Sequence, residues 1–218
     1  MTNDQFELKS RRYIGNKAKL TDWILTKIKA ETRTNDTFID VFSGTSIVAC
    51  AAMQTYKKVI LNDILHSNNL IYNAFYPTTP WDKVKVNQIV DKYNGLNGDN
   101  LPSNYFSKNF GGKFYDENIS KIIGFIREDL ELKKQSGELS AREYSILLTS
   151  LIYTMDRLAN TVGHFDAYIK KNIQTKPLNF RLIKTLDFAG ADIHQEDANQ
   201  LARKIQGEVA YIDPPYNS

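Results

Sequence analysis

Hydrophobic and polar positions follow a strand and helix rhythm in the first third of the chain. β-Branched and aromatic residues cluster at 37–41 and 58–61, and each cluster has the length of a buried strand. Between them, residues 47–53 have a compact helical pattern. Strand, helix and strand in this order form the unit that builds a parallel sheet, so the pattern predicts an α/β fold.

The same rhythm returns near the end of the sequence. The pattern predicts a weak strand at 191–195, a short helix at 198–206 and a buried strand at 208–212. These elements extend the sheet that the first third of the chain begins.

The residues between these two parts do not keep the rhythm and are too many for an ordinary connection. We therefore expect one discontinuous domain, formed by 1–67 and 191–218, with a largely helical insertion at 68–190. Within the insertion, Ser140 and Glu143 have the spacing of a capping box that opens a long amphipathic helix. Its apolar stripe is typical of core packing.

The composition excludes several classes of protein. Of the 218 residues, 42% are hydrophobic and 24% charged, which is typical of a globular chain and not of a disordered one. A single cysteine, Cys50, cannot form an internal disulfide framework. No apolar run approaches the roughly 18 residues of a membrane span. We expect a soluble, cytoplasmic protein without a membrane partner.

Charge is distributed unevenly, although the net charge is only +3. Residues 157–184 contain six basic side chains against the single acid Asp166, interleaved with three aromatic residues. This mixture is typical of a nucleic-acid surface, and a solvated face with ordinary core aromatics explains it equally well. The basic candidates for DNA contact are Lys170, Lys171, Lys176 and Arg181.

The tetrapeptide at 213–216 is the most informative motif. Pro214 and Pro215 end the strand and present rigid carbonyl acceptors, preceded by Asp213 and followed by Tyr216. Such a site suits a planar base with an exocyclic amine: Asp213 and the Pro214 carbonyl accept its two N–H bonds, and Tyr216 stacks on its face. A simple loop after a strand is the alternative interpretation.

Two further motifs follow predicted strands. The first strand runs into a turn whose small residues would let a ligand approach the next helix; its members are Phe42, Ser43, Gly44, Thr45 and Ser46. Asp63 follows the second strand, where a nucleoside's ribose hydroxyls would be held, although a surface aspartate is an equal alternative. Three scattered histidines and one cysteine predict no metal site.

Together these motifs resemble the alpha-group N6-adenine DNA methyltransferases, the Dam- and MboI/DpnII-like methylases of bacteria and phages. The resemblance spans the chain in order: RYIGNK at 12–17, FSGTS at 42–46, LND at 61–63, a long target-recognition insertion, and DPPY at 213–216. It implies a Rossmann-like methyltransferase sheet and S-adenosylmethionine as cofactor.

The resemblance also implies roles for particular residues. Tyr13 and Lys17 would contact the methionine end of the cofactor, the 42–46 turn would pass beneath it, and Asp63 would take the ribose hydroxyls. Asp197 and Ala198 would meet the cofactor adenine. The segment 159–168 resembles a stretch of restriction-modification enzymes near cofactor or DNA, where we interpret His164 as a structural histidine.

The implied reaction is methyl transfer to N6 of an adenine flipped out of double-stranded DNA into the DPPY pocket. Family members continue beyond DPPY with segments that close this pocket. We therefore expect activity to need a C-terminal segment or complementing chain. The alternatives are an inactive truncated or split module that binds S-adenosylmethionine or DNA, and an RNA N6-adenine methyltransferase.

Overall fold

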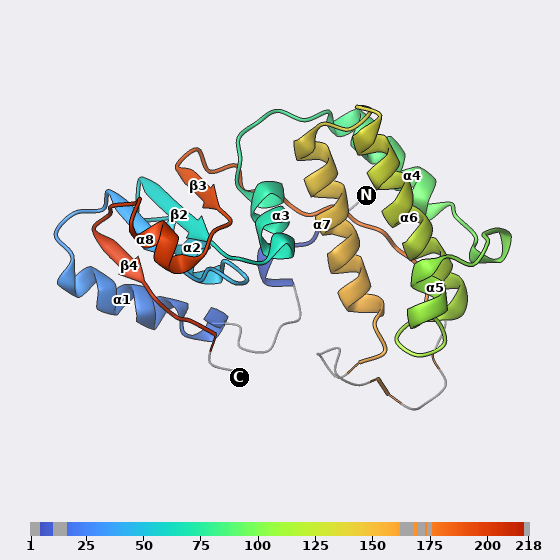
Figure 1. Ribbon diagram of the computed structural model, residues 1–218, viewed down its shortest axis with the longest axis horizontal. Helices are drawn as coiled ribbons and strands as arrows, with labels where there is room; N and C mark the ends of the chain where they lie inside the picture. Colours follow the sequence, from blue (N-terminus) through green and yellow to red (C-terminus); the bar gives the residue numbers. More distant parts are fainter. Residues whose placement is uncertain (1–4, 11–16, 162–167, 170–172, 174–175, 216–218) are drawn as a thin grey trace. The chain divides into compact units, whose positions relative to one another are not determined.

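The computed structural model describes residues 5–10, 17–161, 168–169, 173 and 176–215 (Figure 1). The chain forms two compact units. The sheet unit comprises 15–78 and 185–218, and the helical unit comprises 1–14 and 79–184.

The sheet unit is built on four parallel strands in the order β3-β2-β1-β4. Their bounds are β1 Thr37–Asp40, β2 Lys58–Asn62, β3 Ala191–His194 and β4 Val209–Tyr211. From β1 the chain steps outward to β2 and β3, and then returns to the other side of β1 as β4 (Figure 1). The order therefore reverses beside β1, and ligands of open α/β sheets bind outside the carboxyl ends of strands at such a reversal.

The central strands are apolar because both faces of the sheet are covered. Phe38, Val59, Ile60 and Leu61 are all buried. The helices of this unit are α1 Thr21–Glu31, α2 Ile47–Ala52, α3 His66–Phe75 and α8 Ala198–Ala202. A 3₁₀ turn, η2, spans Lys17–Lys19. The predicted α/β, Rossmann-like class is confirmed.

The helical unit contains the predicted long helix, α7 Ala141–Leu158, beside α4 Lys83–Asn94, α5 Tyr105–Phe110 and α6 Glu117–Gln135. Two 3₁₀ turns, η1 Leu8–Ser10 and η3 Gly98–Asn100, complete it. The Ser140 side chain accepts from the Glu143 N–H and Glu143 caps the Ser140 N–H, which confirms the capping box. None of the helices in the described ranges is long and apolar enough to cross a membrane.

The boundaries between the units differ from the expected ones at both ends of the insertion. Helix α3 belongs to the sheet unit, because Phe75 and Tyr76 are buried there. Their carbonyl groups accept the N–H groups of Leu186 and Phe188, which lead into β3. At the N-terminus, Phe6 pairs with the backbone around 182–184 and so joins the helical unit.

Several predicted elements end earlier in the structure. The helix after Asp197 stops at Ala202 instead of 206. The last strand ends at Tyr211 instead of 212. Helix α8 has only five residues, and Leu201 is the one among them that is buried.

Candidate active site

Three carboxylates lie at the carboxyl edge of the sheet. Asp40 ends β1, Asp63 directly follows β2, and Asp213 lies two residues beyond β4. Asp40 is close enough to both of the others for their negative charges to raise its pKa. Parallel strands bring these acids together from distant parts of the sequence.

The turn after β1 is fixed by backbone and side-chain hydrogen bonds. The Ser43 N–H donates to the Asn62 carbonyl over 2.8 Å, and Ser43 Oγ donates to the Asp40 carbonyl over 2.9 Å. Gly44 and Ser46 have positive φ angles of 51° and 56°. Glycine adopts this left-handed conformation readily, whereas a serine there needs support from its surroundings.

Asp63 supports this turn directly. Its Oδ2 accepts the Gly44 N–H at 3.0 Å and the Asn68 side-chain amide at 2.8 Å, and its Oδ1 accepts the Leu65 N–H at 2.8 Å. The sequence motifs predicted Asp63 and Gly44 as neighbours in a site but not this contact. The carboxylate is half-buried, and the two side chains after it, Ile64 and Leu65, are exposed.

Asp213 forms a cluster with two other polar side chains. The Lys17 ammonium lies 3.1 Å from Asp213 Oδ2, and the Tyr211 hydroxyl donates to the same oxygen over 3.2 Å. Burial, followed by the negative charge of Asp213, raises the pKa of Tyr211 to about 12, so its hydroxyl keeps its proton. Pro214 and Pro215 are exposed beyond this cluster.

A small cavity of about 30 Å³ lies between these groups. Its lining residues come from η2, the end of β1, the turn, the start of α2 and the end of β4: Lys17, Asp40, Phe42, Ser43, Thr45, Ile47, Val48, Tyr211 and Asp213. The structure therefore brings five of the predicted site residues together around one space: Lys17, Phe42, Ser43, Thr45 and Asp213.

Asp40 is the residue of this cavity that sequence reasoning missed. It is only 1% exposed, and its Oδ1 has no hydrogen-bond partner among the described residues. Burial is the main cause that raises the pKa of Asp40 to about 8, against the backbone N–H groups of Ala49 and Phe42, which lower it. The sequence did contain a signal that could have identified Asp40 as a site residue: it is an acid at the end of a buried strand, just before the turn.

Asp197 and Ala198 lie at the start of α8. Asp197 caps the helix by accepting the N–H groups of Asn199 and Gln200. The preceding residue, Glu196, is held by Asn62, whose side chain bonds to both its N–H and its carbonyl group. These bonds tie the ends of β2 and β3 together.

The remaining predicted residues fall into two groups. Tyr13, Tyr216, His164, Lys170 and Lys171 lie outside the described residues. Lys176 is exposed in the helical unit, whereas Arg181 is half-buried with its guanidinium group 4.7 Å from the Phe6 ring centre. No cluster of three metal-ligating side chains occurs in the part of the chain that the structure describes.

Comparison with known proteins places this geometry in a context. Residues 13–218 match the model of the D12 class N6 adenine-specific DNA methyltransferases. The chain is 30% identical to the type II methyltransferase M.NlaIII of Neisseria lactamica over 216 residues. It is 32% identical to the type II methyltransferase M.CviAII of Paramecium bursaria Chlorella virus 1 over 217 residues. Each alignment covers 94% of this chain but only 64% of the relative.

Proposed function

Because the chain belongs to the D12 class of N6 adenine-specific DNA methyltransferases, we propose that it transfers a methyl group from S-adenosylmethionine to N6 of adenine in double-stranded DNA. The observation that carries this proposal is the cavity at the carboxyl edge of the sheet, where Lys17, Asp40 and Asp213 meet around the turn at 42–46. Relatives named as type II methyltransferases and as a modification methylase support a place in a restriction-modification system.

The residues of the cavity fit the amino-acid end of S-adenosylmethionine. Asp40 presents a buried oxygen with no described partner, which suits the cofactor's ammonium group. Lys17 supplies positive charge for the cofactor's carboxylate, and Tyr13 would complete this end. The turn at 42–46 lets the ligand approach the backbone because it contains Gly44 and small hydroxyl side chains.

The nucleoside end would lie along the edges of β2 and β3. Asp63 would accept the ribose hydroxyls, since each carboxylate oxygen can accept more than one hydrogen bond. Asp197 and Ala198 would meet the adenine ring, and the exposed side chain of Ile64 offers an apolar surface beside them. The Asn62 bonds to Glu196 support this arrangement by holding the two loops together.

The bound cofactor supplies an electrophilic methyl group on a sulfonium. In the proposed site, Asp213 Oδ1 and the Pro214 carbonyl accept the two N6–H bonds of the target adenine, while Tyr216 stacks on its ring. Lys17 and Tyr211 both contact Oδ2, so they fix the carboxylate without using the other oxygen. Asp213 Oδ1 and the Pro214 carbonyl would orient N6 toward that methyl group, and Asp213 Oδ1 would accept the proton that N6 loses on transfer.

We propose that the helical unit, whose insertion part spans 79–184, binds the DNA. Lys170, Lys171, Lys176 and Arg181 would contact phosphates, which contributes affinity without selecting sequence. The target adenine must leave the duplex to reach Asp213, at a cost of a few kcal/mol that these contacts offset. The contact of Arg181 with Phe6 gives that side chain a packing role as well.

Product analysis tests the proposed function. The protein and tritiated S-adenosylmethionine are incubated with double-stranded DNA containing many sequence contexts, and the nucleosides are separated by mass. We expect N6-methyladenine in duplex DNA and none in a matched RNA. N4-methylcytosine as the product, or transfer confined to RNA, would contradict the proposal.

We further propose that full activity needs sequence that pairs with the outer side of β4. This strand is an edge of the described sheet, and Ile212 directly after it is 64% exposed. An uncovered edge strand with apolar neighbours favours pairing with a further segment. The relatives offer the length for such a segment, because the chain spans 64% of M.NlaIII and M.CviAII. The alternative is a module that binds S-adenosylmethionine or DNA without catalysis.

Extending the chain after residue 218 with whatever segment of such a relative follows the part aligned to this chain separates these alternatives. Without this segment the pocket around the flipped base would stay open and the base would be held less accurately. A misplacement of the reacting atoms by about 1 Å costs roughly a hundredfold in rate. We expect the 218-residue chain to bind cofactor but to transfer methyl groups at least about a hundredfold more slowly than the extended chain. Equal rates for the two chains would exclude this requirement.

A further inference from the structure

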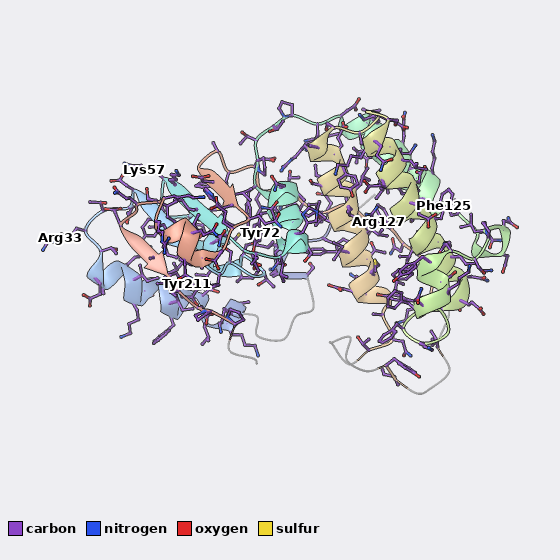
Figure 2. The ribbon with its side chains drawn as sticks, viewed as in Figure 1. Arg33, Lys57, Tyr72, Phe125, Arg127 and Tyr211 are labelled. Carbon is purple, nitrogen blue, oxygen red and sulfur yellow. The ribbon has the colours of Figure 1, made fainter. Side chains whose placement is uncertain are left out.

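Helix α3 and Tyr76, the residue that directly follows it, carry a row of polar groups that all reach the turn at 42–46 or its supporting carboxylate. Asn68, Tyr72 and Tyr76 are spaced four residues apart and therefore share one helix face. All three are buried. Figure 2 labels Tyr72, which extends from α3 within the sheet unit.

Each member of the row makes a short hydrogen bond. Asn68 donates to Asp63 Oδ2 over 2.8 Å, and the Tyr72 hydroxyl donates to the Gly44 carbonyl over 2.7 Å. The Tyr76 hydroxyl lies 2.7 Å from Ser46 Oγ. Apolar side chains would be enough to bury this helix face. The polar atoms at the ends of these three side chains therefore do more than pack.

The row holds the two residues of the turn that have left-handed backbone conformations. Gly44 is held on both sides, because its N–H donates to Asp63 and its carbonyl accepts from Tyr72. Ser46 has a φ of 56°, which is unfavourable for a residue with a side chain, and Tyr76 bonds its hydroxyl. Without these partners the turn would lose the bonds that favour this conformation.

We propose that Asn68, Tyr72 and Tyr76 are positioning residues that hold the 42–46 turn and Asp63 in the geometry that binds cofactor. The inference rests on the proposed function, because it takes this turn as the cofactor site. The main chain leads from Asp63 straight into α3, so one helix fixes both the acid for the ribose and the turn beneath the cofactor. Its far end is fixed in turn by the bonds from Leu186 and Phe188.

The variant Tyr72→Phe tests the proposal with the smallest change. It keeps the ring and removes only the hydroxyl that bonds to Gly44. A hydrogen bond of this kind contributes about 0.5–1.5 kcal/mol, equivalent to a roughly two- to twelvefold change in affinity. We expect calorimetry with S-adenosylhomocysteine, the cofactor without its methyl group, to show about three- to tenfold weaker binding.

The matched control is Tyr93→Phe in the helical unit. Tyr93 is also buried, and its hydroxyl donates to Asp129 over 2.7 Å, so this variant removes a comparable bond far from the turn in sequence. We expect its melting temperature to fall about as much as that of Tyr72→Phe, while its affinity for S-adenosylhomocysteine stays at the wild-type value. Tyr76→Phe should follow Tyr72→Phe.

The outcomes separate this inference from the proposed function. Asp63→Ala serves as a positive control, because it removes the carboxylate itself. If the wild type binds and Tyr72→Phe binds equally well, the positioning role is wrong. If Tyr93→Phe loses as much affinity as Tyr72→Phe, the loss reflects general stability and the inference again fails. If the wild-type chain does not bind S-adenosylhomocysteine at all, the proposed cofactor site is wrong.

Discussion

We expect methyl transfer to fall by at least about a hundredfold when Asp213 is replaced by Ala, while the affinity for cofactor changes little. Removal of a single group that stabilises a transition state typically costs about 10²–10³ in rate. Asp213 is placed for this role by its position after β4 and by the contacts of Lys17 and Tyr211 with its Oδ2. Lys17 keeps its positive charge in this variant, so binding of the cofactor's carboxylate should not weaken.

Transfer of a tritiated methyl group to duplex DNA gives the rate, and calorimetry with S-adenosylhomocysteine gives the affinity. The assay uses the chain extended with that segment of a relative, so that a low baseline does not hide the effect. Asp36→Ala is the control, because Asp36 precedes β1 at the other edge of the sheet and is paired with Lys57 on the surface. Asp213→Ala with near-normal transfer would remove Asp213 from the reaction.

Much of the sheet could be predicted, because parallel strands that are buried on both faces appear in the sequence as short apolar runs. The strands that begin at Thr37, Lys58 and Ala191 start where the sequence placed them. The motif spacing also placed Asp63 and Asp213 at the carboxyl edge. These features follow from local sequence, since strand ends and turns depend on neighbouring residues.

The contacts across the site could not be predicted in the same way. The expected insertion began at residue 68, inside α3, because the residues from there on break the strand rhythm, yet Tyr72 and Tyr76 form hydrogen bonds with the turn at 42–46. The pairing of Lys17 with Asp213 joins positions almost 200 residues apart in sequence, so no local pattern reports it. The raised pKa of Asp40 is caused mainly by its burial, and the sequence alone does not show that this aspartate is buried.

Asp40 gives the second large prediction, which concerns stability against pH. Burial raises its pKa from 3.8 to about 8, whereas the unfolded chain returns the group to its ordinary value. Between these two values the folded state keeps a proton that the unfolded state has released. Raising the pH across this window therefore favours unfolding, and the loss of stability is complete above about pH 8.

The size of this effect follows from the difference between the two pKa values. Each unit corresponds to about 1.4 kcal/mol, so the ionisation of Asp40 lowers the stability of the cofactor-free protein by up to about 6 kcal/mol at high pH. Asp40→Asn mimics the protonated acid and cannot ionise. The variant should match the wild type only at or below about pH 3.8, and its stability advantage should grow steadily from pH 5 up to about pH 8.

Thermal unfolding of the two proteins at a series of pH values measures this difference in stability. The contribution of histidine titration cancels in the comparison, because both proteins contain the same histidines. Asp36→Asn controls for the substitution itself, since that exposed carboxylate is already ionised across the window: its pairing with Lys57 lowers its pKa.

The same experiment with S-adenosylmethionine present reports on the cofactor site. An ammonium group beside Asp40 would stabilise the ionised form of the carboxyl group. Saturating cofactor should therefore flatten the pH dependence of the wild type's stability, and the Asp40→Asn variant should bind the cofactor weakly. A wild-type profile that runs parallel to that of Asp40→Asn from pH 5 to 8.5 would show that Asp40 does not titrate in this window.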